Sequence, residues 1–394
     1  MQLTETVKLY PNKYQTELIK ATMSEYISTV NHLVLDAING RAITKITTAD
    51  VNAILPSALC NQCIRDAKSI VKKYDKACKE VEKAKKNKKN QKSKKNKNSK
   101  NVKEVEEIKE VKKLKEIKVP VLKKLCCYIN NQNFKIQDNY ISFPVMIDGK
   151  SKRISVKTKM TDKQKLILSS HRLGTMRIVI KNINTLVAQF VYEINEIEKV
   201  NESNNVMGVD LGIKCPAVSY CTDGSVKFYG NGRKNKYMRR HYANLRKWFQ
   251  KAKKPTVAKR IKNKEQRIMK DIDHKISREI VNTAKKHKAK VIKLERLENI
   301  RSTTRTSRKN NPSLHTWSFY RLAQYIEYKA KLAGIEVEYV YPAYTSQKCP
   351  QCGNIHHAKD RKYICKCGYH THRDLLGAIN ICNSTEYIGN RCIA

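Results

Sequence analysis

The apolar positions near the start of the chain change from strand spacing to helix spacing. Residues 3–10 alternate apolar and polar side chains, which is typical of a strand. After Pro11 the apolar side chains recur every three or four positions, and Asn12 and Gln15 are suited to begin a helix. A further helix is predicted over about 48–81. The chain therefore opens with one predicted strand followed by a helical block.

A lysine-rich stretch follows these helices. Residues 83–101 are almost entirely Lys, Asn, Gln and Ser, which cannot bury enough apolar surface to offset the entropy of ordering. We expect a disordered or weakly helical basic insertion here. From 102 to 117 apolar residues recur every third position, so their line spirals around a helix and only part of it can face a core. We expect a helical arm rather than a member of a packed bundle.

From about 125 to 200 the apolar period becomes two. Short alternating segments are separated by turn residues at Asp148-Gly149 and Lys181-Asn182. This pattern predicts a small antiparallel barrel or sheet. The helical block then interrupts a β domain whose first strand is the N-terminal one.

After Asn205 predicted strands alternate with predicted helices. A hairpin signal stands at Asp223-Gly224, and Gly334 is placed to end a helix. The predicted order is strands 206–211 and 217–221, a basic helical region 233–288 interrupted at Pro255, strand 291–297, helix 318–333, strand 335–340 and a helix from 374. Such alternation indicates an α/β sheet.

The charge of the chain indicates the class of partner that it binds. Its 394 residues contain 81 Lys and Arg but only 35 Asp and Glu, a formal net charge of +46. AT-rich codons explain part of the Lys, Asn, Ile and Tyr excess, but they do not explain the scarcity of acids. A chain so basic repels itself unless a polyanion neutralises it, so we expect nucleic acid as the partner.

The cysteines indicate a reducing compartment. Thirteen is an odd number, and nine of them have no regular spacing, unlike a secreted disulfide framework. The pair Cys60 and Cys63 lies in an apolar series, so we expect it to pack in a core. The N-terminus lacks a signal-peptide pattern and no apolar run approaches a membrane span. We expect a cytoplasmic protein, nucleoid-associated when bound to DNA, without membrane contact.

Four of the cysteines form two close pairs near the C-terminus. Cys349 and Cys352 are separated by two residues, and Cys365 and Cys367 by one. Two such pairs supply the four thiolates of a tetrahedral structural zinc ion. We expect all four cysteines to ligate one zinc ion. His370 and His372, the alternative ligands, are expected to contact phosphate or solvent.

Three acids stand in settings where a lone carboxylate is costly. Asp210 and Glu295 end apolar strand-like runs, and Asp374 opens the last predicted helix. A strand-end salt bridge or a helix cap would explain any one of them. Together, in strand, strand and helix contexts, they match the layout of an RNase H-like nuclease. Such enzymes hold two magnesium ions with convergent carboxylates and hydrolyse phosphodiesters.

The residues around these acids resemble the TnpB family of transposon-encoded, RNA-guided DNA nucleases, from which type V CRISPR effectors derive. The similarity covers 205–382 closely and the start of the chain more loosely. It rests on Gly-Val-Asp210-Leu-Gly-Ile-Lys, Leu-Glu295-Arg-Leu-Glu-Asn-Ile-Arg, Trp317-Ser-Phe-Tyr-Arg-Leu, Tyr344-Thr-Ser-Gln-Lys-Cys349 and His372-Arg-Asp374-Leu-Leu-Gly-Ala-Ile-Asn-Ile. The resemblance implies that Asp210, Glu295 and Asp374 are the RuvC magnesium ligands. Many members have Asp-X-Asn-Ala where this chain has Asp374-Leu-Leu-Gly, which leaves the acid intact.

The resemblance also implies a multi-domain α/β architecture. The expected domains are a wedge β-barrel (1–10 and 122–200), a helical recognition domain (11–121) with its Lys-rich insertion (83–118), an RNase H-like RuvC nuclease domain (201–348 and 368–394) and a zinc ribbon (349–367).

The expected function is RNA-guided cutting of double-stranded DNA beside a short flanking motif, by a single two-metal site. The expected partners are a guide RNA and target DNA, with a monomer favoured. A miniature type V CRISPR effector, a nuclease-inactive RNA-guided repressor and an unguided zinc-ribbon DNA-binding protein are the alternatives.

Overall fold

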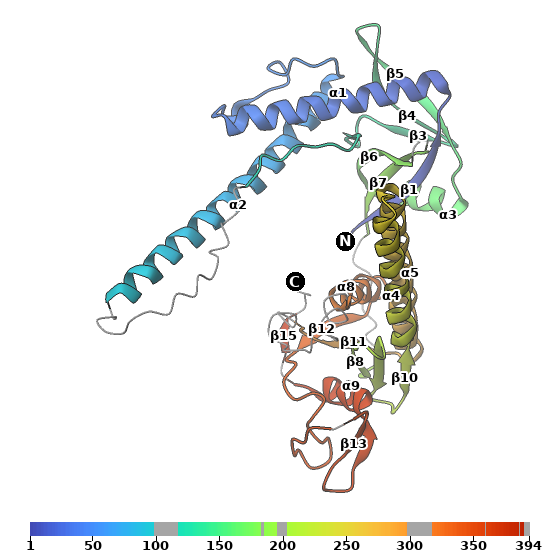
Figure 1. The fold of residues 1–394 in the computed structure, drawn as a ribbon. Helices are drawn as coiled ribbons and strands as arrows, with labels where there is room; N and C mark the ends of the chain where they lie inside the picture. The colour runs from blue at the N-terminus through green and yellow to red at the C-terminus, as the bar shows by residue number, and fades with distance from the viewer. Residues whose placement is uncertain are drawn as a thin grey trace. The chain divides into compact units, whose positions relative to one another are not determined.

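The structure, a computed structural model, divides the chain into two compact units, 1–195 and 196–394 (Figure 1). It describes residues 1–97, 117–182, 185–194, 203–297, 317–358, 360–385 and 387–389; at 84–97, 182, 262 and 387–389 it describes the backbone alone. None of the helices in this part of the chain combines the length and apolar character of a membrane span.

The first unit is built on a curled seven-stranded antiparallel sheet, as the period-two pattern predicts. Its strands lie in the order β2-β6-β7-β1-β5-β4-β3. Their bounds are β1 Gln2–Tyr10, β2 Cys126–Ile129, β3 Lys135–Gln137, β4 Tyr140–Ile147, β5 Lys150–Thr158, β6 Leu173–Asn182 and β7 Thr185–Glu193. The N-terminal β1 pairs with β7 along most of its length and with β5 at its end. The helical block is therefore inserted, in sequence, between strands of one sheet.

Helix α1 (Lys13–Ile38) begins where the sequence predicts. The backbone amide of Gln15 donates to Asn12 Oδ1 at 2.7 Å, and the amide of Asn12 donates to Gln15 Oε1 at 3.2 Å, which completes a capping box. Cys60 and Cys63 of the next helix are buried, which confirms that this pair packs in the core.

Helix α2 (Ser57–Lys97) corrects the predicted start near residue 48. The Asp50 carboxylate accepts hydrogen bonds from the amide and hydroxyl of Thr47, which holds a loop where we expected helix, after a short 3-10 turn at Ile43–Lys45. Pro56 also disfavours helical backbone at the residue before it. At its other end α2 is helical in its backbone through Lys97, so part of the lysine-rich stretch is helical. Residues 98–116, with most of the predicted helical arm, lie outside the described residues.

The sequence prediction missed one helix in the first unit. Helix α3 (Asp162–Ser170) interrupts the period-two block, and a capping box of Thr161 and Gln164 begins it. That four-residue signature is legible in the sequence. The turn at Asp148-Gly149 is confirmed, because both residues have positive φ, 51° and 72°. The second predicted turn continues into residues 183–184, outside the described residues.

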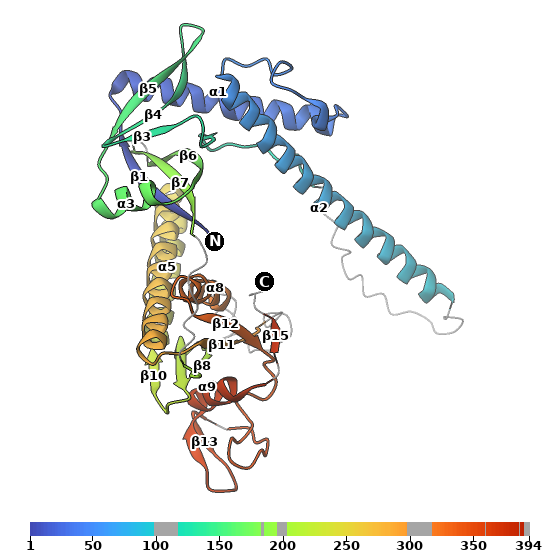
Figure 2. The ribbon, with the colours of Figure 1, turned by 180° about the vertical axis from the view of Figure 1, so that it is seen from behind.

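The second unit contains the predicted α/β sheet (Figure 2). Strands β8, β11 and β12 are parallel, whereas β9, β10 and β15 pair antiparallel. The sheet order is β10-β9-β8-β11-β12-β15, with bounds β8 Val206–Asp210, β9 Ala217–Cys221, β10 Val226–Tyr229, β11 Val291–Glu295, β12 Glu336–Val340 and β15 Tyr387–Gly389.

Helices pack on this sheet according to its alternating side chains. Their bounds are α4 Gly232–Lys251, α5 Pro255–Lys286, α8 Phe319–Lys331 and α9 Arg373–Asn383. Met207 and Val209 of β8 share an apolar core with α5 and α8, so Gly208 and Asp210 face the other way. A Cβ on Gly208 would lie 2.3 Å from the carbonyl oxygen of Ala378 in α9, which shows how closely that helix packs there.

The break at Pro255 is confirmed, because α4 ends at Lys251 and α5 begins at Pro255. Proline is well tolerated in the first turn of a helix. Between β12 and α9 the chain forms a small hairpin, β13 (Lys362–Ile364) with β14 (His370–His372).

Candidate functional site

Asp210 and Glu295 lie side by side at one edge of the second sheet. Asp210 is the last residue of β8 and Glu295 the last of β11. These strands are parallel, and Val209 pairs with Leu294, so the two acids occupy the next position of the register. Val209 and Leu294 are both buried, whereas the two acids are half-buried. Alternation therefore places both carboxylates on the face that α9 covers.

Asp374 reaches the same edge from α9. It lies in the first turn of that helix, where its amide donates to Nδ1 of His372, the N-cap residue, at 3.2 Å. One turn further, a Cβ on Gly377 would lie 3.2 Å from the carboxyl carbon of Asp210. Residues three apart share a helix face, so the face that carries Asp374 packs on Asp210. The structure thus brings the three predicted acids together.

The acids interact electrostatically. Burial, and then the charges of Glu295 and Asp374, raise the pKa of Asp210 well above its ordinary value. Burial likewise raises the pKa of Glu295 to about 7, although a hydrogen bond from Thr345 opposes the shift. Carboxylates that destabilise one another when ionised are stabilised by a cation between them. The donor set therefore fits a divalent cation with oxygen ligands, such as magnesium.

Two of the acids have partners that the sequence prediction missed. The hydroxyl of Thr345 donates to Glu295 Oε1, and the guanidinium of Arg361 donates to Asp374 Oδ1. The side-chain amide of Asn380 donates to the carbonyl oxygens of Thr345, at 2.6 Å, and Lys348, at 2.8 Å. Thr345 and Asn380 stand inside the quoted family motifs, but nothing in the local sequence distinguishes Arg361.

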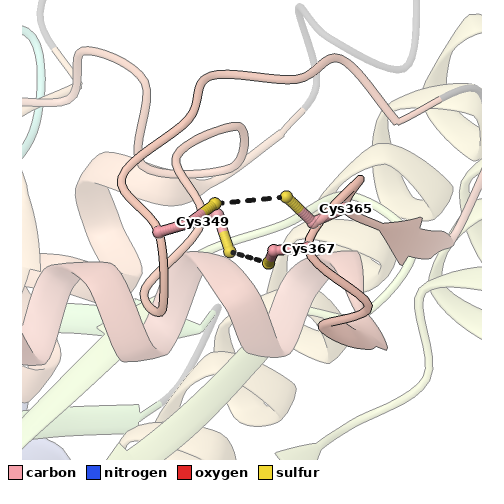
Figure 3. A group of neighbouring side chains, drawn as sticks. Cys349, Cys365 and Cys367 are labelled. Atoms are coloured by element: carbon pink, nitrogen blue, oxygen red, sulfur yellow. Dashed lines mark hydrogen bonds between the residues drawn. The ribbon is translucent and has the colours of Figure 1, made fainter.

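The four predicted cysteines form a compact group in the hairpin region. Their sulfurs all lie within 4.8 Å of one another, with Cys349 and Cys367 at 3.7 Å and Cys352 and Cys365 at 3.5 Å. Figure 3 shows the labelled thiols turned toward one another. The backbone amide of Cys367 is the main cause that lowers the pKa of the Cys365 thiol, to about 6. Four converging thiols, one of them readily ionised, fit a tetrahedral zinc ion.

The two nearby histidines are not in this group, among the residues that the structure describes. His372 caps α9, and its ring packs edge-on against Phe228 with centroids 5.3 Å apart. We expected a phosphate-contacting or solvated side chain there. The cap explains the difference, because His372 ends β14 immediately before the first helical residue. His370 Nδ1 lies 3.3 Å from the carbonyl oxygen of Gly368.

A basic cavity of about 370 Å³ lies close in sequence to Asp210. Gly212 and Ile213, just after Asp210 and Leu211, form part of its wall. Its cationic lining comes from α4: Lys236, Arg239, Arg240, Arg246 and Lys247. Glu265 pairs with Arg246 and lies 3.9 Å from Arg239, which leaves a surplus of positive charge. Such a lining suits an anionic ligand.

Comparisons with known proteins agree with the motifs. A family model described as "Cas12f1-like, TNB domain" matches residues 319–381, and one described as "Probable transposase" matches 189–301. A TnpB-like protein of Methanocaldococcus jannaschii is 28% identical over 275 residues, covering 65% of this chain and 95% of that protein. A CRISPR-associated endodeoxyribonuclease Cas12f1 of Sulfoacidibacillus thermotolerans is 31% identical, over 48% of each chain.

A solved structure matches most of the chain. The Cas12f1–sgRNA–target DNA complex superposes with a TM-score of 0.65 and 16% identity, covering 95% of this chain and 82% of that one. The fold is therefore a Cas12f-like α/β fold with a curled antiparallel sheet. The chain spans about half the length, or less, of the curated Cas12f1 relatives that it matches. Together the matches confirm the resemblance to the TnpB family.

Proposed function

We propose that this chain is an RNA-guided DNA endonuclease of the TnpB type, which cuts double-stranded DNA beside a short flanking motif. The observation that carries the proposal is the meeting of Asp210, Glu295 and Asp374 at one sheet edge. Among the described residues, the direct ion pairs of these acids are limited to that of Asp374 with Arg361. Burial, and then the charges of Glu295 and Asp374, raise the pKa of Asp210, and burial raises that of Glu295, so a bound cation would stabilise both ionised carboxylates.

The topology of the second unit supports an RNase H-like, RuvC-type nuclease. An antiparallel meander, β8 to β10, is extended on the other side of β8 by the parallel strands β11 and β12. The acids are the last residues of β8 and β11 and a residue in the first turn of α9. We assign 201–348 and 368–394 to this nuclease domain and 349–367 to a zinc ribbon. We assign 1–10 and 122–200 to a wedge domain and 11–121 to a recognition domain.

In this proposal the three acids hold two magnesium ions, and Cys349, Cys352, Cys365 and Cys367 hold one structural zinc ion. Bound magnesium would activate water and stabilise the leaving oxygen of a phosphodiester. The protein's own part is to keep the carboxylates in place. Thr345 and Asn380 orient Glu295 through the loop before the ribbon, and Arg361 orients Asp374 from within the ribbon.

Arg361 also supplies a positive charge beside the acids. The Arg361 side chain is 36% exposed, whereas the Asp374 side chain is 13% exposed. We infer that it contacts the substrate phosphate next to the carboxylates, as arginine suits bidentate phosphate contacts. The ribbon would thus be coupled to the nuclease site through this side chain, in addition to the packing of Leu376 of α9 against Cys349, Tyr363 and Cys365.

The partners in this proposal are a guide RNA and target DNA. The net charge of +46 gives the chain a large capacity for backbone phosphates, and guide pairing would supply the sequence specificity. The solved structure that this chain resembles is itself a complex with sgRNA and target DNA. A monomer remains our expectation for the assembly.

A miniature type V CRISPR effector is the second candidate. It is favoured by the structural match to Cas12f1 and differs in the source of its guide. A CRISPR array beside the gene would favour it, and transposon ends would favour the TnpB type. A nuclease-inactive repressor is disfavoured, because all three acids are present and adjacent.

Sequencing of RNA that copurifies with the full chain tests guiding directly. We expect one discrete, structured RNA species. Replacing the segment of that RNA that pairs with target DNA should redirect cleavage to a plasmid carrying the new complement, and only with magnesium present. Random RNA fragments, together with cleavage that ignores the guide, would instead indicate an unguided DNA-binding protein.

A further inference from the structure

Two tyrosines and a lysine form one row across three strands of the first unit. Tyr10 at the end of β1 pairs with Lys157 of β5, and Lys157 pairs on its other side with Tyr140 of β4. Neighbouring strands lie about 4.8 Å apart, so the two tyrosines are separated by about 10 Å with the lysine between them. We call these three residues the tyrosine platform.

The platform faces away from the core of the unit. The neighbours of its residues along each strand, Leu9, Val156 and Ile141, are all buried. Alternation therefore places Tyr10, Lys157 and Tyr140 on the opposite, outer face. Tyr10 is 45% exposed and Tyr140 is 48% exposed, and Lys157 is exposed as well. Two large aromatic rings that gain little from burial in the folded chain are placed to contact something else.

The surroundings of the platform are mainly cationic. The Lys8 ammonium lies 4.6 Å from the centroid of the Tyr10 ring. Lys135 on β3 and Arg153 on β5 are exposed and lie an even number of residues from the row, so they share its face. Asp138, in the turn between β3 and β4, is an acid near this row. The charge around the two rings therefore favours an anionic ligand with flat apolar groups.

We propose that the tyrosine platform binds unpaired nucleotides of a single-stranded nucleic acid, one base on each ring. Aromatic rings on an open sheet face stack on bases, and the π-face of every base permits it. Lys157, between the rings, would meet the phosphates that connect the two bases. The inference deepens the proposed function, on which it rests, by naming a segment of this chain that takes the unpaired part of a guide or target strand.

A paired helix does not fit this surface in the same way. Its bases are already stacked on one another, so it can offer the platform only backbone phosphates. The distinguishing property of the platform is therefore a preference for single strands that depends on the rings and not on salt. A merely basic surface would bind both forms and would weaken steeply as salt rises.

The test is binding of labelled oligonucleotides to the full chain, freed of copurified nucleic acid, across a salt series. The probes are a short single-stranded RNA, a DNA of the same sequence and a fully paired duplex. The Tyr10→Ala/Tyr140→Ala variant should bind the single strands at least about tenfold more weakly at every salt concentration, since stacking contributes severalfold or more per base. Duplex binding should change less than about twofold.

Two matched variants separate stacking from other effects. Tyr10→Phe/Tyr140→Phe keeps both rings and should bind like wild type, whereas Lys157→Ala should lower the salt slope of single-strand binding by about 0.7. A loss confined to the RNA probe assigns the platform to the guide, and a loss confined to DNA assigns it to a target strand. The proposal is overturned if the alanine variant loses duplex and single-strand binding equally, or if the phenylalanine variant loses as much as the alanine variant.

Thermal unfolding of each variant checks that the exposed substitutions leave the fold intact. The readout does not involve cleavage, so its failure leaves the acidic cluster and the proposed nuclease untouched. An inactive nuclease would equally leave this binding test unaffected.

Discussion

The cysteine group and the acidic cluster are both sets of candidate metal ligands, but the structure arranges them differently. The four thiols converge on one another with sulfur atoms within 4.8 Å. The three acids meet at one sheet edge, but Glu295 accepts a hydrogen bond from Thr345 and Asp374 accepts one from Arg361. The cysteine group contains the four ligands that a zinc ion needs, whereas two of the three carboxylates are positioned by hydrogen bonds from neighbouring residues.

The difference follows from charge. A thiol with its ordinary pKa, about 8.5, is mostly neutral at pH 7. Even with the pKa of Cys365 lowered to about 6, the four thiols can therefore gather at less electrostatic cost than ionised carboxylates. Carboxylates with their ordinary pKa are ionised at neutral pH and repel one another, and here burial and the charges of Glu295 and Asp374 both raise the pKa of Asp210. We infer that the thiol site serves structure and the acid site serves chemistry. Four substitutions or pairs of substitutions can break or sharpen this comparison.

Removal of the central acid should have the largest effect. Asp210→Ala should abolish cleavage of both DNA strands, because Asp210 lies next to Glu295 and packs on the helix that carries Asp374. Guide-dependent DNA binding should be nearly unchanged, since a carboxylate adds little affinity for a polyanion.

Gel assays of cleavage and binding on the same preparation measure both. Asp271→Ala, which removes an exposed acid paired with Lys275 on α5, is the matched control and should cut normally. Nicking of one strand by the Asp210 variant would show a second active site or a wrong assignment of the acids.

Loss of one thiol should disrupt the ribbon. Cys352 is exposed, so Cys352→Ser removes a ligand without opening a cavity in the core. We expect the wild-type chain to carry about one zinc ion and the variant to lose it, with faster amide exchange over the ribbon. Elemental analysis and hydrogen exchange measure these changes. Cys78→Ser, outside the cysteine group, should retain zinc; an equal loss there would contradict the four-cysteine site.

A methyl group added beside Asp210 should weaken catalysis without unfolding the chain. In Gly377→Ala the new Cβ would lie 3.2 Å from both the carboxyl carbon and Oδ2 of Asp210, so the carboxylate must shift. We expect cleavage to fall by about tenfold, given how steeply catalysis depends on position. Alanine is a better helix former than glycine, so α9 should persist.

The neighbouring glycine supplies the contrast. In Gly208→Ala the Cβ would meet the Ala378 carbonyl oxygen at 2.3 Å and the Cys382 amide nitrogen at 2.4 Å, both of them backbone atoms of α9. That variant should lose thermal stability, whereas Gly377→Ala should lose activity. Thermal unfolding and cleavage rates of the two variants measure these losses. Equal losses of stability and of activity in both variants would contradict the predicted packing of α9.

The acid cluster should also make stability depend on pH. The pKa of Glu295 is raised from its usual value of 4.5 to about 7. The unfolded chain therefore releases this proton first, and the folded state loses stability as pH rises from about 4.5 to about 7. In magnesium-free buffer, Glu295→Gln should stabilise the fold above pH 7 by up to about 3 kcal/mol and have no such benefit below pH 4.5.

Denaturant unfolding at two pH values measures the difference. Added magnesium should reduce the advantage of the glutamine variant, because the cation stabilises the ionised carboxylate. Equal effects of the substitution on the free energy of unfolding at both pH values would show that the pKa of Glu295 is not raised in the folded chain.

Much of the architecture was determined by local sequence. The period-two block, the capping box at Asn12 and the break at Pro255 all depend on neighbouring residues, and the structure confirms each. The predicted start of α2, near residue 48, was wrong. Pro56 and the hydrogen bonds that Asp50 accepts from Thr47 outweighed the apolar pattern. Helix α3 was missed although its capping box was legible.

The sequence by itself also determined the ligand chemistry, because residue type decides what can be held: thiols in two close pairs, and acids that end apolar strands. Only the tertiary structure decided which distant groups meet. Parallel pairing of β8 with β11 sets Asp210 beside Glu295, and the packing of α9 on Gly208 brings Asp374 to them. Tertiary structure also decided the contact of Arg361 with Asp374 and the alignment of the tyrosine platform. Their residues are unremarkable in sequence, and strand register and hairpin folding give them their neighbours.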